Sequence, residues 1–213
     1  LNYNKKFLNI SDTSEFWLDA QSKINLDGKF RLFKTHNSLT EVNKNKFTDS
    51  NNTLGGIYMI RDPRNVITSI KNHYEQTYEE ALDFMLDEKG ILYEKENNQY
   101  VNFQFLSSWS NHYKSWIYTK EFPIKLIKYE DLANNTYKTF EEVINFISIT
   151  NNIKHPFNIK KAKNCIESTN FEILKKMEKK EGFREGAIGQ KTKKKITFFN
   201  LGEKNIWNKK IPK

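Results

Sequence analysis

The most informative chemical feature of the sequence is an arginine at the end of an apolar run. Residues 57–60 are Ile-Tyr-Met-Ile, and Arg61, Asp62 and Pro63 follow directly before an amphipathic pattern. Asp is a preferred N-cap and Pro a preferred first helical residue, so the sequence predicts a strand that leads straight into a helix. A helix N-terminus attracts anions, and an adjacent arginine adds a planar donor suited to phosphate. Two interpretations remain open: Arg61 binds an anion, or it pairs with Asp62 and covers the strand end.

Two other predicted strands also end in polar residues. Residues 34–36 are Lys-Thr-His, and residues 129–131 are Tyr-Glu-Asp. In a parallel sheet the carboxyl ends of the strands lie along one edge, and ligands bind beyond that edge. We therefore expect these two polar groups to join Arg61 in one site.

The elements that must position these residues alternate between strands and helices. The strand at 55–61 is an uninterrupted apolar run, of the kind that is buried on both faces, and the helix at 139–147 opens with a capping box from Thr139 to Glu142. Apolar spacing predicts further strands at 29–36 and 123–132, and further helices at 15–24, 63–74, 78–90, 103–120 and 160–168. A basic tail without a clear pattern follows. This alternation predicts an α/β fold with a mostly parallel central sheet flanked by helices.

Length and composition limit the class of protein. The chain has 213 residues, of which 37% are hydrophobic, and this suits a single domain over residues 1–213. No apolar run approaches the roughly 18 residues of a membrane helix, so no membrane partner is expected. Cys165 is the only cysteine, which excludes an internal disulfide and favours a reducing, cytoplasmic location. No His and Cys residues have metal-ligand spacing, so no metal is expected.

The basic residues are concentrated in the last quarter of the chain. Residues 160–213 contain 16 Lys or Arg against 6 Asp or Glu, whereas residues 1–159 contain 19 against 20. Such a segment favours an anionic partner, although a lysine-rich surface is often only solvated. A nucleic-acid-binding protein that uses this segment is the alternative from another class. It leaves the three polar strand ends unexplained.

Five segments in order resemble the sulfotransferases that depend on 3′-phosphoadenosine 5′-phosphosulfate (PAPS). The segment IYMIRDPRNVITS is similar to the element of this family that binds the 3′-phosphate, which reads R-N/D-P-x-D/N-x-x-x-S. The resemblance implies that Arg61 and Ser69 bind the 3′-phosphate of PAPS. It also implies a P-loop-NTPase-like sulfotransferase fold.

The resemblance assigns catalytic residues as well. The segment RLFKTH resembles the part of the family that carries the catalytic histidine, which implies that His36 is the general base and Lys34 a nearby cation. The pKa of histidine, about 6.5, suits a base that works near neutrality. The implied reaction moves a sulfuryl group from PAPS to a hydroxyl or amine of a small-molecule or glycan acceptor. As in phosphoryl transfer, positioning and charge neutralisation supply most of the catalysis.

Three later segments imply contacts with the nucleotide. LIKYEDL resembles the Y-E-D-L/M element whose tyrosine contacts the adenine, which is Tyr129 here. ESTNFEILKKME resembles the element in which a threonine and a phenylalanine hold the adenine, which implies Thr169 and Phe171. GFREGAIGQ resembles the F-R-K-G-x-x-G-D/E-W-K/R loop, which implies that Arg184 and Gly186 reach the 3′-phosphate.

The sequence departs from the family pattern in two places. The phosphosulfate-binding loop, P-K-x-G-S/T-S/T-W, normally precedes the other segments, but the first 30 residues hold one glycine, Gly28, and no proline. An N-terminally truncated chain, consistent with Leu1, explains this departure, and a non-catalytic relative that only binds nucleotide is the alternative. In the tail loop Glu185 stands where lysine is usual, and the acid–tryptophan pair is missing.

Overall fold

The computed structural model describes residues 5–153, 157–189 and 191–211. The chain divides into two compact units that alternate along the sequence. The first is formed by Leu1–Tyr58, Leu86–Leu126 and Ile147–Ile153, and the second by Met59–Met85, Ile127–Phe146 and Lys154–Lys213. Of the predicted site residues, Lys34 and His36 belong to the first unit and the other seven to the second.

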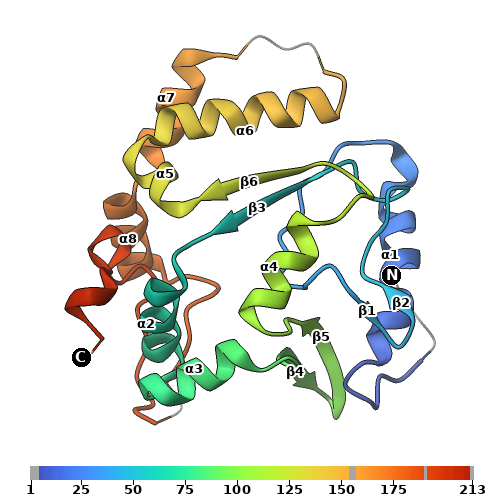
Figure 1. Ribbon diagram of the computed structural model, residues 1–213, viewed down its shortest axis with the longest axis horizontal. Coiled ribbons are helices and arrows are strands. Elements are labelled where there is room, and N and C mark those ends of the chain that lie inside the picture. The colour runs from blue at the N-terminus through green and yellow to red at the C-terminus, as the bar shows by residue number, and fades with distance from the viewer. Residues whose placement is uncertain (1–4, 154–156, 190, 212–213) are drawn as a thin grey trace. The chain divides into compact units, whose positions relative to one another are not determined.

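Strand β3 and helix α2 form the strand–helix unit that the sequence predicts. β3 spans Gly56–Ile60 and pairs in parallel with β6, Ile124–Lys128, while α2 spans Pro63–Tyr74 (Figure 1). The Asp62 side chain caps α2 by accepting a 2.9 Å hydrogen bond from the backbone N–H of Arg64. The parallel pair and its helices confirm the predicted α/β class.

The prediction that β3 is buried on both faces is wrong. Ile57 and Met59 expose 40% and 53% of their surface, while Gly56, Tyr58 and Ile60 are partly covered. In the described part of the chain β6 is the one strand paired with β3. Successive side chains of a strand point to opposite faces, so Ile57 and Met59 lie on one face of β3, and this face is not fully covered.

The strand predicted at residues 29–36 does not form. This segment has neither helix nor strand structure, and Leu32 and Phe33 expose 69% and 67% of their surface. A strand needs a neighbour for its backbone N–H and C=O groups. Among the described residues each sheet has two strands, and none of them pairs with this segment. The apolar spacing of residues 29–36 therefore led to a wrong prediction.

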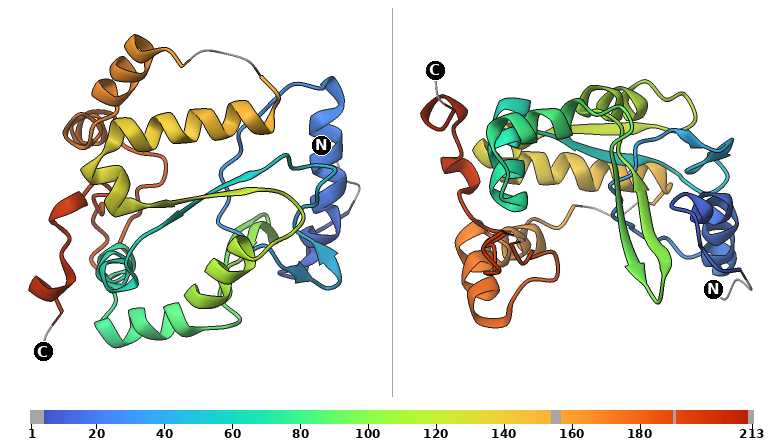
Figure 2. Two further views of the ribbon diagram at one scale, coloured as in Figure 1. Left: turned by 45° about the horizontal axis from the view of Figure 1, so that its top comes forward. Right: turned by 90° about the horizontal axis from the view of Figure 1, so that it is seen from below.

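The sequence analysis missed two antiparallel hairpins of the first unit. β1 spans Glu41–Val42 and β2 Asn45–Lys46, and β4 spans Ile91–Glu96 and β5 Gln99–Phe105. The second hairpin is a twisted two-stranded ribbon, drawn in green in Figure 2. Its turn residues Asn97 and Asn98 have φ of 49° and 60°. Positive φ at both central positions is typical of the two-residue hairpin turn, for which Asn is a preferred residue.

Two helices of the first unit support its core. α1 spans Trp17–Ile24 after a 3-10 turn at Asp12–Phe16 and before another at Asn25–Asp27, in agreement with the predicted helix. The Trp17 ring stacks on that of Phe103, with centroids 5.9 Å apart. α4 spans Trp109–Ile117. It begins later than the predicted helix at 103–120, because residues 103–105 belong to β5 and Ser108 caps the helix.

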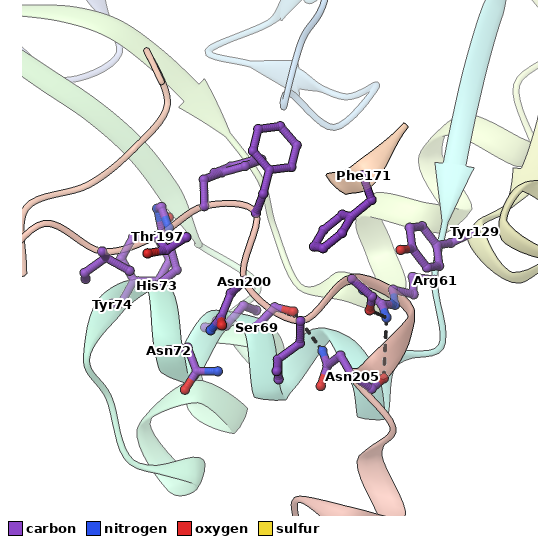
Figure 3. Close-up of a pocket in the computed structure, with 16 residues that line it drawn as sticks. Arg61, Ser69, Asn72, His73, Tyr74, Tyr129, Phe171, Thr197, Asn200 and Asn205 are labelled. Atoms are coloured by element: carbon purple, nitrogen blue, oxygen red, sulfur yellow. Dashed lines mark hydrogen bonds between the residues drawn. The ribbon is translucent and has the colours of Figure 1, made fainter. Parts of the chain in front are cut away.

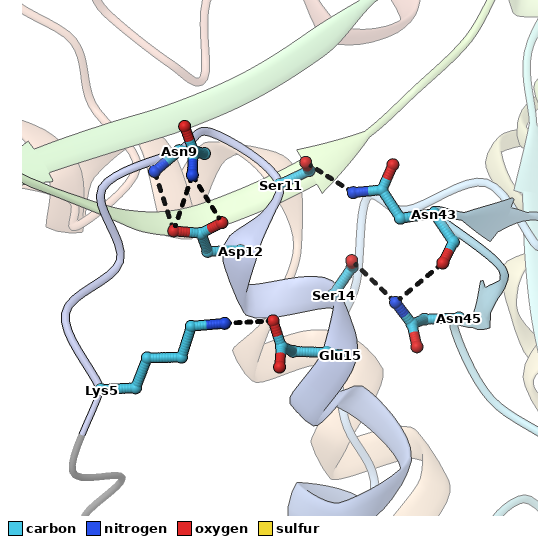
Figure 4. Close-up of polar contacts among 8 residues, drawn as sticks. All are labelled: Lys5, Asn9, Ser11, Asp12, Ser14, Glu15, Asn43 and Asn45. Carbon is cyan, nitrogen blue, oxygen red and sulfur yellow. Dashed lines mark hydrogen bonds and ion pairs between the residues drawn. The ribbon is translucent and has the colours of Figure 1, made fainter.

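Polar contacts hold the N-terminal turn to the β1–β2 hairpin (Figure 4). The Asn43 side chain donates to the Ser11 hydroxyl at 2.9 Å, and Asn45 donates to the buried Ser14 hydroxyl at 3.4 Å. Lys5 forms an ion pair with Glu15 on the same turn. These contacts join the N-terminal turn to the hairpin by side-chain hydrogen bonds.

The remaining helices lie wholly or mostly in the second unit. They are α3 (Tyr78–Leu86), α5 (Tyr129–Asn134), α6 (Thr136–Thr150), α7 (Ile159–Ser168) and α8 (Phe171–Glu181), with 3-10 turns at Gly202–Lys204 and Trp207–Lys209. α6 begins before the predicted capping box, so Thr139 lies inside the helix and its hydroxyl donates to the Asp131 carbonyl at 3.2 Å. The sequence analysis did not separate α8 from the basic tail, although Asn170 caps it.

Among the described helices, none combines the length and the apolar character that crossing a membrane requires.

We predict that the cap of α2 is needed for the stability of the second unit. Asp62→Ala should lower the free energy of unfolding by about 1 kcal/mol in urea titrations, whereas Asp62→Asn, which can still cap, should retain most of it. The pKa of Asp62 is lowered, mainly by hydrogen bonds from the Arg64 side chain. The ionised carboxylate therefore stabilises the fold above about pH 4, and this contribution is lost as the pH falls further. Equal stability of the Ala variant and the wild type at pH 7 would contradict this role.

Candidate functional site

A pocket of about 490 Å³ lies in the second unit, beside the ends of β3 and β6 (Figure 3). Four of the nine predicted site residues line it: Arg61, Ser69, Tyr129 and Phe171. The other lining residues come from α2 and from the tail: Ile70, Asn72, His73, Tyr74, Ile196, Thr197, Phe198, Phe199, Asn200, Leu201, Gly202 and Asn205. The volume is in the usual range for a small-molecule site.

Arg61 is held at the strand end by an aromatic ring and by backbone carbonyls. Its guanidinium lies over the Tyr129 ring, 4.1 Å from the centroid. One terminal nitrogen donates to the Gly202 carbonyl at 2.8 Å and to the Asn205 carbonyl at 3.4 Å (Figure 3). The Nε of Arg61 is buried without a hydrogen-bond partner among the described residues. The guanidinium therefore keeps an unsatisfied donor, which is costly in a protein interior.

The alternative in which Arg61 pairs with Asp62 finds no support in the hydrogen bonds. The Asp62 carboxylate accepts from the Arg64 guanidinium at 2.7 and 3.0 Å, in addition to the backbone N–H of the same residue. Arg64 also lies over the Trp207 ring, 4.3 Å from its centroid. The two neighbouring arginines thus have separate surroundings: Arg61 lines the pocket, and Arg64 does not.

A segment that the sequence analysis missed, residues 200–207, lies against α2. Asn205 is only 4% exposed, and its side-chain N–H groups donate to the Asn65 carbonyl at 2.8 Å and to the Ser69 hydroxyl at 3.0 Å. Its side-chain oxygen accepts from the buried Thr68 hydroxyl. The backbone N–H of Trp207 donates to the Asn65 side chain at 2.8 Å. The tail is therefore held by specific hydrogen bonds to the first turns of α2.

A spacing signal could have identified this segment. In the family's tail loop, a glycine and a tryptophan are separated by four residues, and Gly202 and Trp207 have this spacing. Gly202 has a φ of 54°, and a Cβ there would lie 2.8 Å from the Phe171 ring. Glycine is therefore required at this position for two reasons, a left-handed backbone and a close aromatic neighbour.

Aromatic side chains form the apolar wall of the pocket. The rings of Phe171 and Phe199 meet edge to face with centroids 6.1 Å apart. The Glu178 carboxylate, 3% exposed, fixes this wall by accepting from the backbone N–H groups of Phe198 and Phe199 at 2.7 and 2.9 Å. Burial raises the pKa of Tyr129, so its hydroxyl stays protonated at neutral pH. Neutral aromatic faces beside a cation suit a planar, anionic ligand.

Three predicted contacts of the second unit do not line the pocket. Thr169 ends α7, and its hydroxyl donates to the Cys165 carbonyl at 2.6 Å. Arg184 is exposed, and Gly186 closes the same turn through its N–H to the Phe183 carbonyl at 2.9 Å. The structure therefore places the 200–207 segment, and not this turn, beside Arg61 and Ser69.

The predicted catalytic pair lies in the first unit. Lys34 and His36 are both exposed, in the segment without regular structure. The His36 carbonyl accepts a 3.1 Å hydrogen bond from Nε2 of His112 on α4. In the described residues there is no group of three or more His, Cys, Asp or Glu side chains that could hold a metal ion.

The sulfotransferase domain family matches the chain over residues 8–204. The chain belongs to the sulfotransferase family. This confirms the resemblance and the sulfotransferase fold inferred from the sequence.

Among solved structures, the chain is similar to mouse sulfotransferase SULT7A1, solved as a complex with PAP. The two are 20% identical with a TM-score of 0.39, and the match covers 56% of this chain and 39% of that one. No protein with a curated description matches the chain. The family assignment therefore rests on the domain match.

We predict that Asn205 holds the tail on α2. Asn205→Ala removes three hydrogen bonds that its buried side chain makes to α2, at a cost of about 1–3 kcal/mol. Hydrogen exchange should therefore become faster at the N–H of Trp207, which donates to α2. Asn208→Ala, at an exposed position nearby, is the matched control and should leave exchange unchanged. Unchanged protection of Trp207 in the Asn205 variant would show that its side chain does not anchor the tail.

Proposed function

We propose that the protein transfers a sulfuryl group from PAPS to a hydroxyl or amine acceptor. The observation that carries this proposal is the position of Arg61, which lines a partly aromatic pocket and keeps an unsatisfied buried donor. The family match supports sulfuryl transfer, and the sequence motif points to a 3′-phosphate as the ligand of this arginine. The roles of individual residues are part of this proposal.

Arg61 and Ser69 would bind the 3′-phosphate. The guanidinium now donates to two neutral carbonyls, which a charged phosphate oxygen can replace with stronger hydrogen bonds. Ser69 lies on α2, the helix that follows Arg61, and lines the same pocket. We expect the backbone of residues 200–207 to take the role that the family resemblance assigns to Arg184 and Gly186, because this segment already lies beside Arg61.

Tyr129 and Phe171 would contact the adenine, with Phe199 extending the aromatic wall. Stacking on a flat aromatic face suits a planar base. Thr169 remains a predicted adenine contact. It precedes Phe171 by two residues, and its hydroxyl would have to leave the Cys165 carbonyl to reach the base.

His36 would act as general base, with Lys34 as a nearby cation. The acceptor oxygen or nitrogen forms a bond to sulfur while the bond from sulfur to the bridging oxygen breaks. 3′-Phosphoadenosine 5′-phosphate (PAP) leaves, and the acceptor proton passes to the His36 imidazole. Loss of this proton transfer typically costs about 10²–10⁴ in rate. The acceptor would be a small molecule or a glycan that carries such a group. We expect the protein to act in the cytoplasm, because its single cysteine, Cys165, fits a reducing compartment.

We predict that Arg61→Ala weakens PAP binding by about 2–3 kcal/mol, because a phosphate charge loses its hydrogen-bonding partner. Isothermal titration calorimetry measures this effect directly. Lys71→Ala is the matched control, since Lys71 is a cation on α2 that does not line the pocket. Equal PAP affinity in wild type and Arg61→Ala would refute the phosphate assignment. Salt-dependent binding of single-stranded nucleic acid in place of PAP would favour the nucleic-acid alternative.

We predict that His36→Ala abolishes transfer of the radiolabelled sulfuryl group from PAPS and leaves PAP affinity within about twofold of wild type. The reason is that a base acts on the acceptor proton and not on nucleotide binding. A variant that turns over at the wild-type rate would exclude His36 as the base. A loss of PAP binding in the same variant would instead place His36 in the nucleotide site.

A further inference from the structure

We propose that His112 is a positioning residue for the catalytic base, held in place by the Tyr58 hydroxyl. The inference rests on the proposed function, because it concerns the residue that would take the acceptor proton. All of its contacts lie within the first unit.

The predicted base, His36, lies at the end of a segment that has no regular structure to hold it in place. Residues 28–36 have no helix or strand structure, and the His36 side chain is exposed. The next two residues are buried, since Asn37 is 5% and Ser38 1% exposed. The place of His36 is therefore set by what holds the buried polar residues that follow it.

Strand β5 holds this point from one side. The backbone N–H of Phe105 donates to the Asn37 side-chain oxygen at 2.8 Å. The N–H and the hydroxyl of Ser38 both donate to the Phe105 carbonyl, at 2.8 and 2.9 Å. These bonds fix residues 37 and 38 to the sheet edge but leave the His36 carbonyl to another partner.

Helix α4 supplies that partner with three side chains from adjacent turns. His112 Nε2 is 3.1 Å from the His36 carbonyl, and Trp116 Nε1 donates to the Asn37 carbonyl at 2.9 Å. The Ser115 hydroxyl accepts from the backbone N–H of Leu39 at 2.9 Å. Residues three and four apart on a helix share one face, so one face of α4 holds the backbone from His36 to Leu39.

The hydrogen bonds also define the proton positions on His112. A carbonyl can only accept, so Nε2 carries the proton, and in the neutral ring Nδ1 accepts from the Tyr58 hydroxyl at 2.8 Å. Burial lowers the pKa of His112 and raises the pKa of Tyr58 to about 12, so both groups are neutral at pH 7. The titratable groups that face this pair are His36 and Tyr113. The His36 carbonyl thereby selects this tautomer, and the Tyr58 hydroxyl orients the ring by donating to Nδ1.

Kinetics of the full chain test this inference. His112→Leu removes both hydrogen bonds and should lower kcat for sulfuryl transfer by about 100-fold, the usual effect of a displaced catalytic group, with PAP affinity unchanged. His112→Gln keeps an N–H that can donate to the His36 carbonyl, and it should recover at least about tenfold of that loss. Tyr58→Phe should cause a smaller loss, and Tyr118→Phe, a substitution at a residue 66% exposed, should cause none.

Nitrogen NMR of the wild-type imidazoles gives a readout that does not depend on activity. We expect His112 to be neutral at pH 7 with the proton on Nε2. A proton on Nδ1 would overturn the proposal, and so would equal kcat losses in the Gln and Leu variants or unchanged kcat in His112→Leu. Wild-type protein that neither binds PAP nor transfers sulfuryl groups would overturn the proposed function itself, and calorimetry distinguishes that outcome. If His112→Leu fails to fold, Tyr58→Phe and His112→Gln still decide.

Discussion

The first turns of α2 present polar groups to which other segments of the second unit bond. Asn65 presents its carbonyl and side chain to Asn205 and Trp207, and the Thr68 and Ser69 hydroxyls complete the binding of Asn205. The strand before this helix delivers Arg61 to the same place. The tail and the arginine therefore meet because one strand–helix turn positions both.

This arrangement explains how a site for an anion can exist next to a carboxylate. Asp62 caps α2 and is occupied by Arg64, so its charge is neutralised away from the pocket. Arg61 is then free of an acidic partner in the turn and lies over Tyr129. The aromatic wall beside it is fixed by the buried Glu178, whose charge is satisfied by backbone N–H groups. The positive charge in the pocket thus remains available to a ligand.

Local signals in the sequence were enough to predict the β3–α2 unit, because the cap, the proline and the apolar stripe all lie within twenty residues of one another. Sequence reasoning also selected four residues that line one pocket, since motif order carries long-range information. It failed for residues 29–36, where apolar alternation did not reveal whether a neighbouring strand exists. It also missed the 200–207 segment, because a buried asparagine that bonds to a helix 140 residues away leaves no periodic pattern.

We propose that Arg61 and α2 form a site for the 3′-phosphate of the nucleotide. The most direct measurement compares, by calorimetry on the wild-type chain, PAP with adenosine 5′-phosphate, which lacks only that phosphate. One charge-assisted hydrogen bond contributes about 1.5–3 kcal/mol, so PAP should bind at least about tenfold more tightly. Equal affinities for the two nucleotides would contradict this phosphate site, because they would show that the 3′-phosphate is not recognised.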